Sequence, residues 1–170
     1  ATFRASQGGP LELQLDIEGI DETVNATVFP TLSISTVGPY MFSDAVLNLA
    51  GNPYSFLDFE VIVDNQLIGD RHLNSLTRTA LPEGGRLVQW TLNAPYGDST
   101  ALYGLAAAGV ACTATFTLGA RSCLFSSDRV SFPRQGPTVP DKGEIMFPLV
   151  GVAGRYGSTL ELVVTNDSTG

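Results

Sequence analysis

Apolar and polar residues alternate with a period of two along much of the chain. From Leu11 to Glu18, leucine or isoleucine at odd positions alternates with Glu, Gln or Asp at even positions. This pattern predicts a half-buried strand with a very acidic outer face. Further strands are predicted over 32–36, 44–50, 56–63, 86–93, 110–118, 121–132, 144–150 and 158–165. Turn signals rich in Gly and Pro separate many of them, which favours a mainly β fold, an antiparallel β-sandwich or barrel.

One segment departs from this period. Over residues 98–108, Leu102, Leu105 and Ala106 recur at helical spacing. Asp98 is a plausible N-cap, and Gly109 is a plausible residue just past the C-terminus. The pattern predicts one short α-helix that flanks the sheet, at about 98–108.

A long polar connection, Asp64 to Gly85, joins two of the predicted strands. A connection of this length inside a compact domain is uncommon unless it is functional or disordered. It also carries apolar residues that would be poorly placed on an isolated surface loop, so we predict an arm that docks on another protein. These candidate contacts are Leu67, Ile68, Leu73, Leu76 and Leu81.

Length and charge narrow the classes of function. The chain has 170 residues, which fits one domain. Its formal net charge is −8 with nine Lys and Arg in total, so a basic nucleic-acid footprint is not expected, and an acidic surface would repel DNA. No apolar run is long enough to span a bilayer, and no secretory signal is visible. Because the first residue is Ala1, we expect a processed product, a Met-excised protein or a piece of a longer one.

Residues that could carry chemistry are few. Cys112 and Cys123 are too far apart for a CxxC pair, and a hairpin turning at Gly119 would place Cys123 opposite Phe116. We expect two buried free thiols, with a disulfide or a metal site as the alternatives. The single histidine, His72, lies in the long connection without a nucleophile-elbow sequence.

We therefore predict no enzyme activity, cofactor or metal. The carboxylates Glu12, Asp16 and Glu18 on one strand are interpreted as a solvated face rather than a glycosidase pair. Trp90 alternates with Val88 and Leu92, so it is predicted to lie in the core. Exposed tyrosines could form a carbohydrate-stacking platform, and the candidates are Tyr40, Tyr54, Tyr96 or Tyr156, but no pattern places them on one face.

The order of these parts resembles the tail tube proteins of long-tailed bacteriophages. The resemblance begins at Tyr40–Gly51, continues through the strand Phe59–Leu67 and the loop end Leu81–Arg86, and includes Gly143–Val152. Ser131-Phe132-Pro133 and the terminal strand Thr159 to Asn166 also fit, so residues 40 to 167 are covered in order.

The resemblance implies a structural virion protein whose subunits form rings. The rings would stack into a tube for DNA and a length-setting tape measure protein, closed by a tail terminator. It would be made in the host cytoplasm and would reside in the virion tail, without a membrane partner. Asp64 to Gly85 would be the inter-ring loop. If acidic residues line the channel, the candidates are Glu12, Asp16, Glu18, Asp58, Glu60, Glu144 and Glu161.

Other readings remain open at this point. The chain could be another virion β-protein, such as a baseplate, tail-end or capsid-decorating subunit, or a carbohydrate-binding or adhesin β-sandwich. Many relatives of the family it resembles are about twice as long, with two similar halves. We therefore expect residues 1–170 to be one tail-tube-like domain, either a single-domain member or one half of a longer protein.

Overall fold

The computed structural model describes residues 1–19, 38–68, 85–95, 109–133, 145–153 and 160–165. In this part of the chain, nearly all regular structure is β. The strands are β1 Thr2–Ser6, β2 Glu12–Gln14, β3 Ala45–Leu49, β4 Asn52–Pro53, β5 Asp58–Asp64, β6 Leu87–Pro95, β7 Val110–Leu118, β8 Arg121–Ser131, β9 Met146–Ala153 and β10 Leu160–Thr165; a 3-10 turn, η1 Phe42–Asp44, precedes β3.

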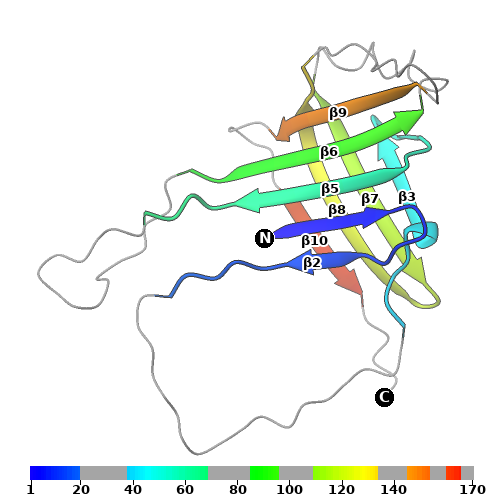
Figure 1. Cartoon of the computed structure of the whole chain (residues 1–170), viewed down its shortest axis with the longest axis horizontal. Coiled ribbons are helices and arrows are strands. Elements are labelled where there is room, and N and C mark those ends of the chain that lie inside the picture. Colours follow the sequence, from blue (N-terminus) through cyan, green and yellow to red (C-terminus); the bar gives the residue numbers. More distant parts are fainter. Residues whose placement is uncertain (20–37, 69–84, 96–108, 134–144, 154–159, 166–170) are drawn as a thin grey trace, which may run out of the picture.

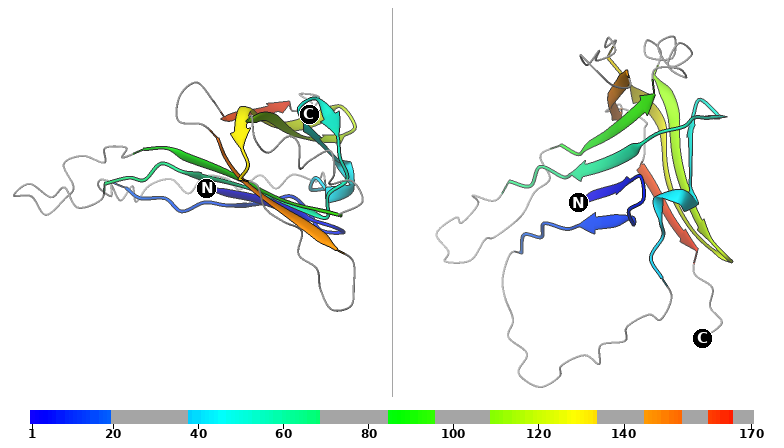
Figure 2. Two further views of the ribbon diagram at one scale, coloured as in Figure 1. Left: turned by 90° about the horizontal axis from the view of Figure 1, so that it is seen from above. Right: turned by 45° about the vertical axis from the view of Figure 1, so that its right-hand side comes forward.

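The strands form two layers joined at a corner (Figure 1; Figure 2). The first layer has the order β2-β1-β5-β6-β9, and the second has β8, β7, β3 and β4 in order, with β10 on the other side of β8. All pairings are antiparallel. The strands of one layer run across those of the other, as in crossed β-sandwiches. This confirms the predicted mainly β, antiparallel fold.

A β-bulge makes the corner. Val110 pairs with Val130 and Cys112 with Ser127, so Asp128 and Arg129 together oppose the single residue Ala111. Bulges bend the strand that carries the extra residue, and here β8 passes from one layer to the other. Before the bulge it pairs with β7 and β10, and after it Val130 pairs with both Val110 of β7 and Ala153 of β9.

The core lies between the layers. Inward residues of β5, β6, β7 and β8 are almost fully buried, among them Phe59, Trp90, Phe116 and Phe125. The Trp90 indole donates a hydrogen bond from Nε1 to Ser127 Oγ at 3.0 Å, which ties β6 to β8 across the sandwich. Trp90 is 1% exposed, so the predicted core position is confirmed.

The hairpin between β7 and β8 also follows the sequence prediction. Leu118 pairs with Arg121, and Gly119 has a φ of +64°, which suits a two-residue loop. Cys123 lies opposite Phe116 as expected. Both cysteines are free and buried.

The prediction for residues 11–18 was only partly right. The strand is limited to Glu12–Gln14, because its ladder with β1 ends at the pair Thr2–Gln14. Leu11 is partly buried against the core, as predicted, but the other three apolar side chains of the segment are exposed: Leu13 by 53%, Leu15 by 57% and Ile17 by 84%. The segment after β2 runs out past the second layer (Figure 2).

The predicted helix at 98–108 and the predicted strand at 32–36 lie outside the described residues. β1, β4 and η1 were not predicted. None of the helices in the described part of the chain is long and apolar enough to cross a membrane.

Gly151 is required by the packing at the corner. A Cβ added there would lie 2.5 Å from two ring atoms of Phe132 and 2.6 Å from Val130. Overpacking of this kind typically costs about 1–3 kcal/mol. We expect Gly151→Ala to lower the free energy of unfolding in urea by about that amount. Gly38→Ala, where an added Cβ meets nothing within 4 Å, is the control; equal stability of the two variants would contradict this account of the corner.

Candidate functional site

The outer face of the first layer collects most of the described candidate carboxylates. The register places Glu12 beside Arg4, Arg4 beside Glu60, and Glu60 beside Thr91. Asp58 lies one row further along β5, between Ser6 and Asn93. The strands β2, β1 and β5 therefore bring together acidic residues from segments almost 50 positions apart in the sequence.

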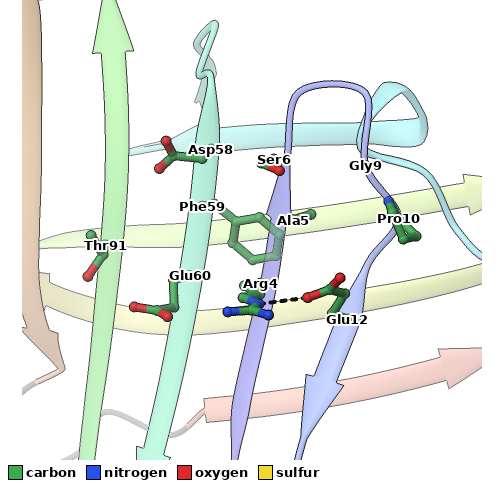
Figure 3. A pocket seen from close by; sticks show the side chains of 10 residues that line it. All are labelled: Arg4, Ala5, Ser6, Gly9, Pro10, Glu12, Asp58, Phe59, Glu60 and Thr91. Carbon is green, nitrogen blue, oxygen red and sulfur yellow. Dashed lines mark hydrogen bonds and ion pairs between the residues drawn. The ribbon is translucent and has the colours of Figure 1, made fainter.

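A hollow of about 470 Å³ marks this region (Figure 3). Arg4 donates from Nε to Glu12 Oε2 at 2.7 Å, and the Asn93 amide donates to Asp58 Oδ1 at 2.7 Å. Arg4 and Glu12 are largely exposed, so this ion pair contributes little to stability. Glu12, Asp58 and Glu60 outnumber the single guanidinium of Arg4, so this surface carries a net negative charge.

A second hollow of about 460 Å³ continues the acidic surface toward the base of the long arm. Asp16 and Glu18 line it together with Ile62 and Asp64. Because Glu60, Ile62 and Asp64 alternate along β5 on its outer side, Asp16 and Glu18 belong to the same face as Glu12 and Glu60. We call this set the acidic face: Glu12, Asp16, Glu18, Asp58, Glu60 and Asp64.

The other two candidate carboxylates, Glu144 and Glu161, are not among the residues of the acidic face. Glu144 lies outside the described residues. Glu161 belongs to β10, where it pairs with Ser126 of β8 in the second layer. The structure therefore brings together five of the seven predicted residues.

The base of the arm is held by polar contacts. The backbone N–H of Gln66 donates to Asp64 Oδ1 at 2.8 Å, and Arg86 donates from Nε to Asn65 Oδ1 at 3.0 Å. Leu67 and Ile68 are exposed by 38% and 41%. Leu73, Leu76, Leu81 and His72 lie outside the described residues.

The remaining candidates for chemistry are occupied in packing. Burial raises the pKa of the Cys112 thiol to about 12 and also raises the pKa of Cys123. The ring of Tyr40 packs on Phe116 with centroids 6.3 Å apart, and that of Tyr54 on Phe56 at 6.4 Å. Tyr96 and Tyr156 lie outside the described residues. Among the described residues, no group of three or more His, Cys, Asp or Glu could hold a metal.

Two features were missed from the sequence. Arg4 is a basic residue within the acidic face, and its strand was not predicted because five residues with only two inward apolar positions give a weak pattern. The second is the outer side of β9, where Met146, Pro148, Val150 and Val152 are all apolar. The unbroken apolar run of β9 was a usable signal, because a strand with only one buried face alternates with polar residues.

The structure combines a crossed β-sandwich that has an acidic face with an arm that exposes leucine and isoleucine and with exposed apolar residues at the sheet edges. This combination is typical of a structural subunit that assembles with other copies. A family model described as "Phage tail tube protein" matches residues 1–154. The chain belongs to this family, as its resemblance in sequence predicted. It is a structural protein of the phage tail and a component of the virion, and its family assembles into tubes. No curated protein matches the chain.

Proposed function

We propose that this chain is the repeating subunit of the tail tube, forming rings that stack into a conduit for DNA. The acidic face carries this proposal. A channel wall with basic residues would bind DNA by releasing its counterions, whereas a negative wall repels the phosphates. The chain has a surface with this property on one layer of the sandwich.

The two outer faces differ in charge. On the second layer, the outward residues of β3, β7 and β8 are uncharged up to the bulge, as in the row Val46, Thr115 and Leu124. On β10, Val163 continues this row, and Glu161 pairs with the outward Ser126, so this layer carries fewer carboxylates than the acidic face. The acidic face lies on the opposite side of the sandwich. We assign the outer face of β2-β1-β5 to the channel and the outer face of the second layer to the tube exterior.

The arm from Asp64 to Gly85 would connect one ring to the next. Its two ends continue β5 and β6, and its first apolar residues, Leu67 and Ile68, are exposed. The partners are then other copies of the chain, a tape measure protein inside the channel and a terminator at its end. The subunit would be made in the host cytoplasm. Residues 1–170 would act as one tube domain, alone or as half of a longer subunit.

Charge reversal on the acidic face tests the channel assignment. The triple variant Glu12→Lys, Asp58→Lys and Glu60→Lys is expected to form tubes but to slow DNA ejection from assembled virions. The delay should be largest at low salt, where the Debye length is about 30 Å at 0.01 M. Ejection is followed by the fluorescence of a DNA-binding dye.

Two single variants, Glu60→Lys and Asp128→Lys, make the same charge reversal at two different places on the surface. Asp128 is exposed at the bulge of β8, away from the acidic face. Glu60→Lys should slow ejection, and Asp128→Lys should leave the rate unchanged. Equal rates for wild type, the triple variant and Glu60→Lys at every salt concentration would remove the channel assignment.

A further inference from the structure

At one edge of the first layer, apolar side chains face the core side of the sheet, but none of the described residues covers them. Leu13 pairs with Phe3, whose ring contacts Phe125 of the core with centroids 4.8 Å apart. Leu13 therefore lies on the core side of the sheet, and the alternation continues through Leu15 and Ile17. All three are exposed, because this edge extends past the second layer. We call Leu13, Leu15 and Ile17 the inner strip.

The opposite edge has an apolar side on the other face. Phe147, Leu149, Gly151 and Ala153 of β9 point into the core. Their alternates Met146, Pro148, Val150 and Val152 point outward and are partly exposed, with Val152 exposed by 42%. We call these four residues the outer strip.

The two strips have the geometry that a head-to-tail contact needs. They lie on opposite edges of one sheet and on opposite faces of it (Figure 1). A ring is generated when one patch of each subunit contacts a different patch of the next. One sheet can overlap the next only if the overhanging edge is apolar on its inner side and the covered edge is apolar on its outer side.

We infer that the inner strip of one copy packs on the outer strip of β9 in the next copy of the same chain, forming a lap joint between neighbouring first layers. This inference rests on the proposed function, because it specifies the contact within the ring.

Charge favours a second copy as the occupant. The outward residues of the overhanging segment are acidic, with Glu12, Asp16 and Glu18 on the side away from the inner strip. In the lap joint these carboxylates cover the uncharged outer strip of the neighbour and face the channel themselves. The acidic lining would then continue from one subunit to the next, and both apolar strips would leave water.

Cross-linking in assembled tubes tests the joint. The double variant Leu15→Cys with Val152→Cys is treated with a short bifunctional maleimide. Within one chain these positions are separated by four strand spacings, about 19 Å, so cross-links must form between copies. The native thiols are buried and do not compete, because the thiolate is the reactive form.

The expected result is a ladder of covalent oligomers from the double variant. A mixture of the two single variants should give dimers only, and each single variant alone should give monomers. Leu15→Cys with Val46→Cys is the control, because Val46 is an exposed apolar residue of the second layer.

Tubes that form normally but give no ladder would overturn the lap joint and leave the proposed function standing. Self-cross-linking of Leu15→Cys alone would also overturn it. Absence of any ring or tube from the wild-type protein would overturn the proposed function, and the joint with it.

A charge placed on the inner strip gives an independent readout. Leu15→Asp is expected to reduce the yield of tubes at least tenfold while the melting temperature of the subunit stays unchanged, because the side chain is exposed in the single chain. Val46→Asp should leave the yield unchanged. Normal tube yield from Leu15→Asp would contradict the joint.

Discussion

Trp90→Ala is expected to unfold the subunit. The indole is 1% exposed at the centre of the sandwich, and its Nε1 donates to the hydroxyl of Ser127, which is 0% exposed. Removing a buried aromatic side chain costs about 3–5 kcal/mol. A typical domain has only about 5–15 kcal/mol of stability, so most of the variant should be aggregated or unfolded at 37 °C. Urea denaturation followed by circular dichroism measures the loss.

Trp90→Phe separates the two contributions of this side chain. Phenylalanine keeps most of the apolar volume but leaves the Ser127 hydroxyl without its indole donor. A buried polar group left without a partner costs about 1–3 kcal/mol, so this variant should fold with a lower urea midpoint. A soluble Trp90→Ala variant with an unchanged midpoint would show that the packing between the layers does not depend on this residue.

Deleting residues 68–82 is expected to leave a folded subunit that cannot stack. The ends of the arm continue β5 and β6, which pair along seven residues without it. A shorter loop changes the closure entropy little, since doubling a loop costs only about 0.6 kcal/mol. Loss of the arm removes the proposed contact between rings, so rings without tubes should be seen by negative-stain electron microscopy.

A variant with the arm replaced by a Gly/Ser segment of equal length is the control. It keeps the loop length but removes the apolar residues, and it should also fail to form tubes. Tubes of normal length from either variant would show that ring stacking does not use the arm.

The sequence predicted best the strands that lie inside the sheet, with a paired strand on each side. Residues 110–118 were predicted as a strand and form β7 with these bounds, and β8 ends one residue before the predicted end. Alternation is strong where one face is buried, and Gly119 fixes the register of the hairpin. The pairing of Cys123 with Phe116 follows from those two signals alone.

The edge of the first layer could not be predicted in the same way. Alternation from Leu11 to Glu18 identifies an apolar side, but it does not say whether anything covers that side. In the structure the second layer leaves Leu13, Leu15 and Ile17 uncovered, so this part of the apolar side is exposed. A pattern that predicts burial in a single chain can therefore mark a contact between chains.

The acidic face was predicted as a set of residues but not as a surface. Alternation places Glu12, Asp16 and Glu18 on one side of their segment. Their approach to Glu60 depends on β1, which inserts between β2 and β5 and whose Arg4 pairs with both Glu12 and Glu60 in the register. Such long-range pairing cannot be read from local periodicity, because it is fixed by the topology of the whole sheet.

A cryo-electron microscopy reconstruction of tubes assembled from the purified protein tests the central claim most directly. We predict stacked rings in which the outer face of β2, β1 and β5, with Glu12, Asp58 and Glu60, lines the channel. The second layer, with Val46 and Thr115, should face the exterior. A channel lined by the outer face of the second layer, or the absence of any tube, would contradict the account.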